Sequence, residues 1–123
     1  MLDISHDGII SMSRGDTIKM TLFINAGTEI HPTRYELSEK DRIYVGICEP
    51  NQPFENAIVR QTYTSDDWEL NDKGDLVVTI SPEETEYLTE GQYYYIVKMV
   101  STNDKGKEIV QTIIPKKKLF IED

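Results

Sequence analysis

The chain has 123 residues, a length that fits one domain with a single hydrophobic core. Its formal net charge is −9. This charge repels phosphate backbones and anionic membrane surfaces, so nucleic acid and membranes are not expected partners. No window approaches the roughly 20 apolar residues of a membrane span, and the N-terminus lacks signal-peptide features. We therefore expect a cytoplasmic protein, or one assembled there into a larger particle. The single cysteine, Cys48, excludes an internal disulfide.

The sequence as a whole predicts a flexible arm at residues 1–8 and a single domain at residues 9–123. A short apolar strand is expected at residues 9–12. Residues 25–41 have no sustained period, which predicts a long connection with a short helical turn near residues 38–40. Between these segments apolar and polar side chains alternate, which is typical of a half-buried strand with four residues on its buried face: Ile18, Met20, Leu22 and Ile24.

The middle of the chain predicts further strands and two hairpins. Residues 42–49 alternate until Pro50 ends the pattern, and the mixed polarity of residues 57–64 predicts an edge strand. The tetrapeptide Asn-Asp-Lys-Gly occurs at residues 71–74 and again at residues 103–106. It suits a type I turn closed by a left-handed glycine, so it predicts a hairpin at each place.

The sequence Ser-Pro-Glu-Glu at residues 81–84 predicts a capping box and one short helical turn near residues 82–88. The aromatic and β-branched run ending at Val100 then predicts the longest strand of the chain. A last strand should begin at Glu108, break at Pro115 and resume at residues 119–121. The sum is an all-β sandwich of seven to eight strands.

A possible corner motif precedes the long strand, at Leu88, Gly91 and Tyr93. This spacing is typical of immunoglobulin-like Greek-key sandwiches, in which the tyrosine hydroxyl bonds back to the preceding connection. We expect Tyr93 to fix this corner.

An ordered set of segments, at residues 11–17, 81–85, 91–97, 112–115 and 119–121, resembles a known family. It is similar to the immunoglobulin-like N-terminal domain of upper baseplate proteins from phages and prophages of Gram-positive bacteria. The resemblance spans residues 9–121 and implies a non-enzymatic structural protein of the virion tail that docks to other tail or baseplate proteins. It implies no catalytic residues and no cofactor. Larger family members continue into further modules whereas this sequence ends at Asp123, so docking is expected rather than receptor attachment.

The long strand has two faces with different expected roles. We expect Tyr93, Tyr95, Val97 and Met99 to face the core. The opposite face would form an apolar patch, suited to a neighbouring protein or to a second copy of the chain. The alternative is that the connection at residues 25–41 covers this patch. Its residues are Tyr44, Tyr94, Ile96 and Val100.

Other motifs have simpler interpretations. Arg-Gly-Asp at residues 14–16 matches an integrin-binding tripeptide but also suits a turn, which we favour. The carboxylates between Asp66 and Asp75 suggest a calcium site, but they lack the ligand spacing of a calcium-binding loop. A solvated acidic loop is therefore favoured. Lysines at residues 116–118 either discourage edge pairing or dock an acidic partner.

Chemistry is weakly represented among the remaining residues. His6, His31 and Cys48 lack zinc spacing, and no histidine base is expected beside Cys48, which is interpreted as a half-exposed strand residue. Hydrolase motifs are absent from the sequence. A structural docking module is therefore the leading hypothesis. A carbohydrate- or cell-surface-binding β-sandwich, suggested by the tyrosines and Trp68, is the alternative.

Overall fold

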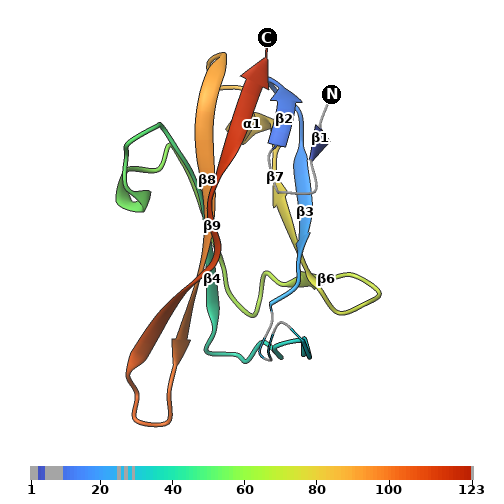
Figure 1. Cartoon of the computed structure of the whole chain (residues 1–123), viewed down its shortest axis with the longest axis vertical. Coiled ribbons are helices and arrows are strands. Elements are labelled where there is room, and N and C mark those ends of the chain that lie inside the picture. Colours follow the sequence, from blue (N-terminus) through green and yellow to red (C-terminus); the bar gives the residue numbers. More distant parts are fainter. Residues whose placement is uncertain (1–2, 5–9, 25, 27, 29, 123) are drawn as a thin grey trace.

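Two β-sheets pack face to face in the computed structural model, which describes residues 3–4, 10–24, 26, 28 and 30–122 (Figure 1). The larger sheet has the order β1 (Asp3–Ile4), β2 (Ile10–Ser13), β9 (Glu108–Glu122), β8 (Gly91–Thr102), β4 (Arg42–Cys48) and β5 (Val59–Tyr63). The smaller sheet has the order β3 (Ile18–Leu22), β7 (Leu76–Ile80) and β6 (Glu69–Leu70). The expected all-β sandwich is confirmed.

Alternating side chains of both sheets meet in one core. Ile43 on β4, Val97 on β8 and Val78 on β7 are completely buried. The period of two on β3 corresponds to one face against the core and one toward solvent, whereas on β4 the residues of the second face, from Tyr44 to Cys48, are half-buried or buried. As expected, β5 lies at the edge of its sheet. Of the arm expected at residues 1–8, only β1 is described, and it pairs with β2; the other six residues lie outside the described part.

The two Asn-Asp-Lys-Gly turns share one hydrogen-bond pattern. In each, the glycine N–H donates to the asparagine carbonyl at 3.0 Å, and the glycine has a positive φ, 86° at Gly74 and 77° at Gly106. The side-chain oxygens of Asn71 and Asn103 each accept two further backbone N–H groups of their turn. Both predicted hairpins are present, β6–β7 and β8–β9.

The predicted short helix is also present. It is α1 (Pro82–Thr85), and its capping box places Glu84 Oε1 at 3.2 Å from the backbone nitrogen of Ser81. A single 3-10 turn, η1 (Phe54–Asn56), lies in the segment between β4 and β5.

Strand β9 differs from the expectation. It is one strand of 15 residues and exceeds the 12 residues of β8, so the expected break at Pro115 and the expected longest strand are both wrong. The register between the two strands shifts between Tyr95 and Val97 and again between Val97 and Lys98. Such a bulge accommodates a proline, which has no N–H for the ladder, without ending the strand.

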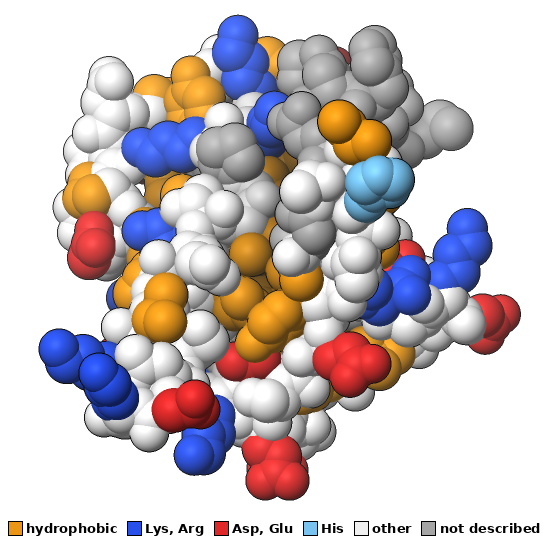
Figure 2. Space-filling view, turned by 60° about the horizontal axis from the view of Figure 1, so that its bottom comes forward, with side chains coloured by type: hydrophobic (Ala, Val, Ile, Leu, Met, Phe, Trp, Pro, Cys, Tyr) orange, Lys and Arg blue, Asp and Glu red, His pale blue; other side chains and the backbone are white. Residues whose placement is uncertain are grey.

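The lower end of the sandwich is where the two sheets separate. The β8–β9 hairpin projects past the other strands there (Figure 1). Figure 2 turns this end toward the viewer and shows hydrophobic side chains gathered in a hollow near the middle of the face.

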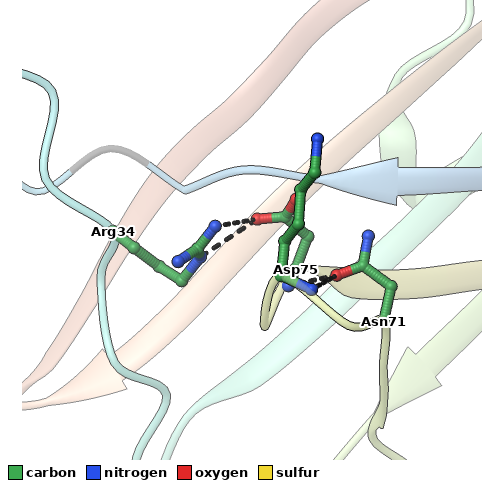
Figure 3. A network of polar contacts seen from close by, with 4 residues as sticks. Arg34, Asn71 and Asp75 are labelled. Carbon is green, nitrogen blue, oxygen red and sulfur yellow. Dashed lines mark hydrogen bonds and ion pairs between the residues drawn. The ribbon is translucent and has the colours of Figure 1, made fainter.

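The connection after β3 crosses this end without forming the expected helical turn. Asp41 is 2% exposed, and its carboxylate accepts the N–H of Ser38 and the hydroxyl of Tyr35, each at 2.9 Å. This side-chain bond to the backbone favours a turn over a helix. Further up the connection, Arg34 contacts Asp75 Oδ1 through two nitrogens, at 2.9 and 3.0 Å, which holds it to the β6–β7 hairpin (Figure 3).

Candidate docking surface on the outer sheet face

The four predicted interface residues lie on the face of the larger sheet opposite the core. The core cluster contains Tyr93, Tyr95, Val97 and Met99, so the predicted division of β8 into two faces is confirmed. Tyr44 and Tyr94 are half-buried, whereas Ile96 and Val100 are each only 8% exposed. The two tyrosines therefore offer a partner more surface than the two aliphatic side chains do.

The cover over this face is Phe54 of η1. A Cβ added at Gly46 would lie 2.7 Å from Phe54 Cε2, so the ring sits directly on the glycine. Phe54 is 9% exposed, and its ring meets the ring of Tyr44 edge-on at 82° with centroids 6.4 Å apart. Sequence reasoning missed Phe54. The signal was Gly46 itself, because a glycine inside a strand often marks a close approach of another segment.

Two basic side chains flank the Phe54 ring. The guanidinium carbon of Arg60 lies 5.0 Å from the ring centroid, and Nζ of Lys98 lies 5.2 Å from it. Both distances are within the range of cation–π attraction. Arg42 instead pairs with Glu108 at 2.7 Å. Within the described residues neither Arg60 nor Lys98 forms an ion pair with a carboxylate.

Together these residues form a groove of about 270 Å³, which we call the Phe54 groove. Its apolar walls come from rings and aliphatic side chains. Its charged lining consists of three cations and two carboxylates, and one of the carboxylates, Glu108, pairs with Arg42. Such a groove suits a partner side chain that carries a carboxylate on an aliphatic stem. Its lining residues are Arg42, Tyr44, Phe54, Glu55, Arg60, Lys98, Val100, Glu108 and Val110.

The described residues of the connection at 25–41 do not take the covering role that the alternative gave this segment. Its described residues Arg34 to Leu37 line a hollow beside Trp68 and Leu70, next to the smaller sheet. Tyr35 and Leu37 pack against the main core. The segment between β4 and β5 covers part of the outer face instead.

The corner residues have the predicted geometry. Tyr93 donates its hydroxyl hydrogen to the carbonyl oxygen of Thr89 at 3.0 Å, and the Thr89 hydroxyl lies 3.0 Å from the hydroxyl oxygen of Tyr93. Leu88 is 1% exposed, and Gly91 has a φ of 149°, a conformation that is nearly restricted to glycine. These contacts fix where β8 begins.

Cys48 differs from the expectation. It lies at the end of β4 and is 1% exposed, so it is buried rather than half-exposed. Burial raises the pKa of its thiol. A thiol in this state is a poor nucleophile.

The side chains of the acidic loop and the Arg-Gly-Asp turn make contacts within the protein. The Asp67 carboxylate accepts the N–H and the hydroxyl of Thr64, each at 3.0 Å, and the N–H bond lowers the pKa of Asp67. Asp75 faces Arg34 instead, so the carboxylates of this loop do not converge. Arg-Gly-Asp forms a turn in which the Asp16 N–H donates to the Ser13 carbonyl at 3.1 Å.

The remaining candidates are dispersed. His31 is exposed, and His6 lies outside the described residues. Lys116 donates to the carbonyl oxygen of Gln52 at 3.1 Å. In the part of the chain that the structure describes, no cluster of three or more His, Cys, Asp or Glu side chains could hold a metal ion, and no helix could span a membrane. No protein-family model, curated protein or solved structure matches the chain.

Proposed function

We propose that the chain is a non-enzymatic structural module that acts by protein–protein docking, in the tail baseplate of a phage or prophage. The observation that carries the docking role is the Phe54 groove. Its cations Arg60 and Lys98, which form no ion pair with a carboxylate of the described residues, border apolar walls in a chain whose net charge is −9. Aromatic and arginine side chains, such as Tyr44, Phe54 and Arg60 here, are typical of interface centres.

The baseplate role is supported by the family resemblance and by features that fit an immunoglobulin-like module. The adjacent strands β3, β7 and β6 correspond in order to strands B, E and D of such a sandwich, and β9, β8 and β4 to G, F and C. The hydroxyl bond of Tyr93 to Thr89 is the matching corner contact.

The test is incorporation into particles. Tail particles purified from an induced host should contain the protein, detected by mass spectrometry. An Arg60→Glu, Lys98→Glu double variant should be at least about tenfold depleted, because the two introduced glutamates would repel a partner carboxylate. The matched control is Lys19→Glu, Lys73→Glu, which changes the same net charge at exposed positions elsewhere. Particles that lack the wild-type protein would refute the baseplate role, and equal incorporation of both variants would refute the groove as the contact.

A carbohydrate- or cell-surface-binding role is the second candidate. Tyr87 is 78% exposed and borders a hollow of about 330 Å³ with Glu83 and Arg60, an arrangement that suits a sugar ring. In contrast, Trp68 is half-buried and packs against the core. Saturable binding on a glycan array that is lost in Tyr87→Ala would favour this role over docking.

A further inference from the structure

In the part of the chain that the structure describes, one edge of strand β9 has no neighbouring strand over most of its length. Strand β2 pairs with it only from Leu119 to Glu122, and β8 occupies its other side. Over residues 108–118 no described strand lies along the outer side of β9. Unpaired N–H and C=O groups along such an edge are a template for another strand.

A groove between the two sheets lies beside this edge. It has a volume of about 570 Å³ and is bordered by Gln111 and Ile113 of β9 and, on the opposite side, by Phe23 and Ile24 after β3. Phe23 is 45% exposed. A strand added beside β9 would point every second side chain toward the sandwich interior, and this groove is the space available to them.

The side chains of the edge itself are also unprotected. Ile109 is 41% exposed and Val110 is 61% exposed, on a strand that projects beyond the rest of the sheet. Natural proteins usually shield such an edge with a covering segment or keep it short. Among the described residues, the shielding of this edge comes from charge at its two ends.

That charge indicates the partner. From residue 104 to residue 118 the hairpin carries five lysines and two carboxylates, in a chain that is otherwise strongly acidic. Two such edges would repel each other, so a second copy is disfavoured. An extended segment with acidic ends and an apolar centre is complementary to it. The lysines are Lys105, Lys107, Lys116, Lys117 and Lys118.

We infer that the β9 edge at residues 108–118 is a strand-addition site for an extended segment of a partner protein, whose apolar centre is flanked by Asp or Glu. The backbone ladder would supply affinity, and the groove beside Phe23 would select the inward side chains. The inference goes beyond the proposed function, because it uses the backbone edge of β9, which shares Glu108 and Val110 with the lining of the Phe54 groove, and does not depend on a phage origin.

The test uses a synthetic peptide in which pairs of glutamates flank a Val-Thr-Val-Thr-Val centre. Binding is followed by NMR titration, together with hydrogen exchange of the β9 amides. We expect saturable binding and at least tenfold slower exchange at some amides of residues 108–114. N-methylation of every second peptide residue removes the N–H groups along one edge of the peptide strand. When that edge faces β9, two or three ladder bonds worth about 1 kcal/mol each are lost, so binding should weaken about tenfold or more. The peptide that is methylated along the opposite edge should bind as the unmethylated peptide does.

Three outcomes would overturn the inference: no binding at millimolar peptide, equal binding by both N-methylated peptides, or a protein dimer whose contact protects the same amides. Lys105→Glu should weaken peptide binding about threefold, as expected for one exposed charge. The matched control is Lys73→Glu, at the same position of the twin turn, and it should leave binding unchanged. The Arg60→Glu, Lys98→Glu variant should also bind the peptide normally, which separates failure here from failure of the proposed function.

Discussion

Replacing Gly46 by alanine is the sharpest test of the outer face. The new Cβ would lie 2.7 and 2.9 Å from two ring carbons of Phe54 and 3.3 Å from Cβ of Ala57. Ordinary contacts of this kind are about 3.5–4.0 Å, so the ring has to move outward by about 1 Å. Strand β4 is central in its sheet and cannot retreat, because it pairs with β5 and β8.

The magnitude follows from what Phe54 loses. Full burial of a phenylalanine is worth about 1.5–3 kcal/mol, and we expect about half of it to be lost. Weakened cation–π contacts with Arg60 and Lys98 add about 1 kcal/mol. Alanine in a strand returns about 0.5–1 kcal/mol relative to glycine. The net expectation is that Gly46→Ala lowers the free energy of unfolding by about 1–2 kcal/mol.

A double-mutant cycle measured by urea unfolding checks this reasoning. In a Phe54→Ala background the clash with the ring is gone, so Gly46→Ala should be neutral or stabilising by up to about 1 kcal/mol. The coupling energy should therefore be about 1.5 kcal/mol or more, with an unchanged m-value. Additive effects of the two substitutions would show that Phe54 does not rest on Gly46, and the docking groove would lose its floor.

Three further predictions concern other sites. Tyr93→Phe removes the bond to Thr89 at a residue 6% exposed and should cost about 1–2 kcal/mol in urea unfolding; no loss would refute the corner. Because the folded pKa of Asp67 is lowered, its stabilisation is present above the unfolded pKa and is lost as the pH falls. Asp67→Asn should therefore show a smaller drop in melting temperature between about pH 5 and pH 2, and a drop equal to that of the wild type would contradict this. Cys48 should react with a thiol reagent about 100-fold more slowly when folded than in urea, and rapid native labelling would contradict its burial.

Local patterns were sufficient for most of the fold. The tetrapeptide at residues 71–74 sets its turn through the oxygen of Asn71 and the left-handed Gly74, and both lie within the motif. The capping box is likewise contained in four residues. Alternation on β4 predicts its buried face because the period of a strand does not depend on distant partners.

The rest depended on segments far apart in sequence. Nothing within residues 49–58 indicates that Phe54 will fold back over Gly46, or that Arg60 and Lys98 will flank its ring. The pattern correctly placed Tyr44 and Tyr94 on the outer face but could not predict what covers it. Pro115 was treated as a break because the bulge that accommodates it is a property of the pairing with β8.

The position of Trp68 allows contact between the two sheets to be followed by intrinsic fluorescence. The chain has one tryptophan and seven tyrosines. Trp68 lies just before β6, beside the smaller sheet. Tyr44, Tyr93, Tyr94 and Tyr95 belong to the larger sheet. Light absorbed by these tyrosines can pass to Trp68 only while the two layers stay together. Tyr63, five residues before Trp68, can pass energy to it in either case. Separation of the sheets should therefore lower tyrosine-sensitised tryptophan emission in the unlabelled wild-type chain without abolishing it.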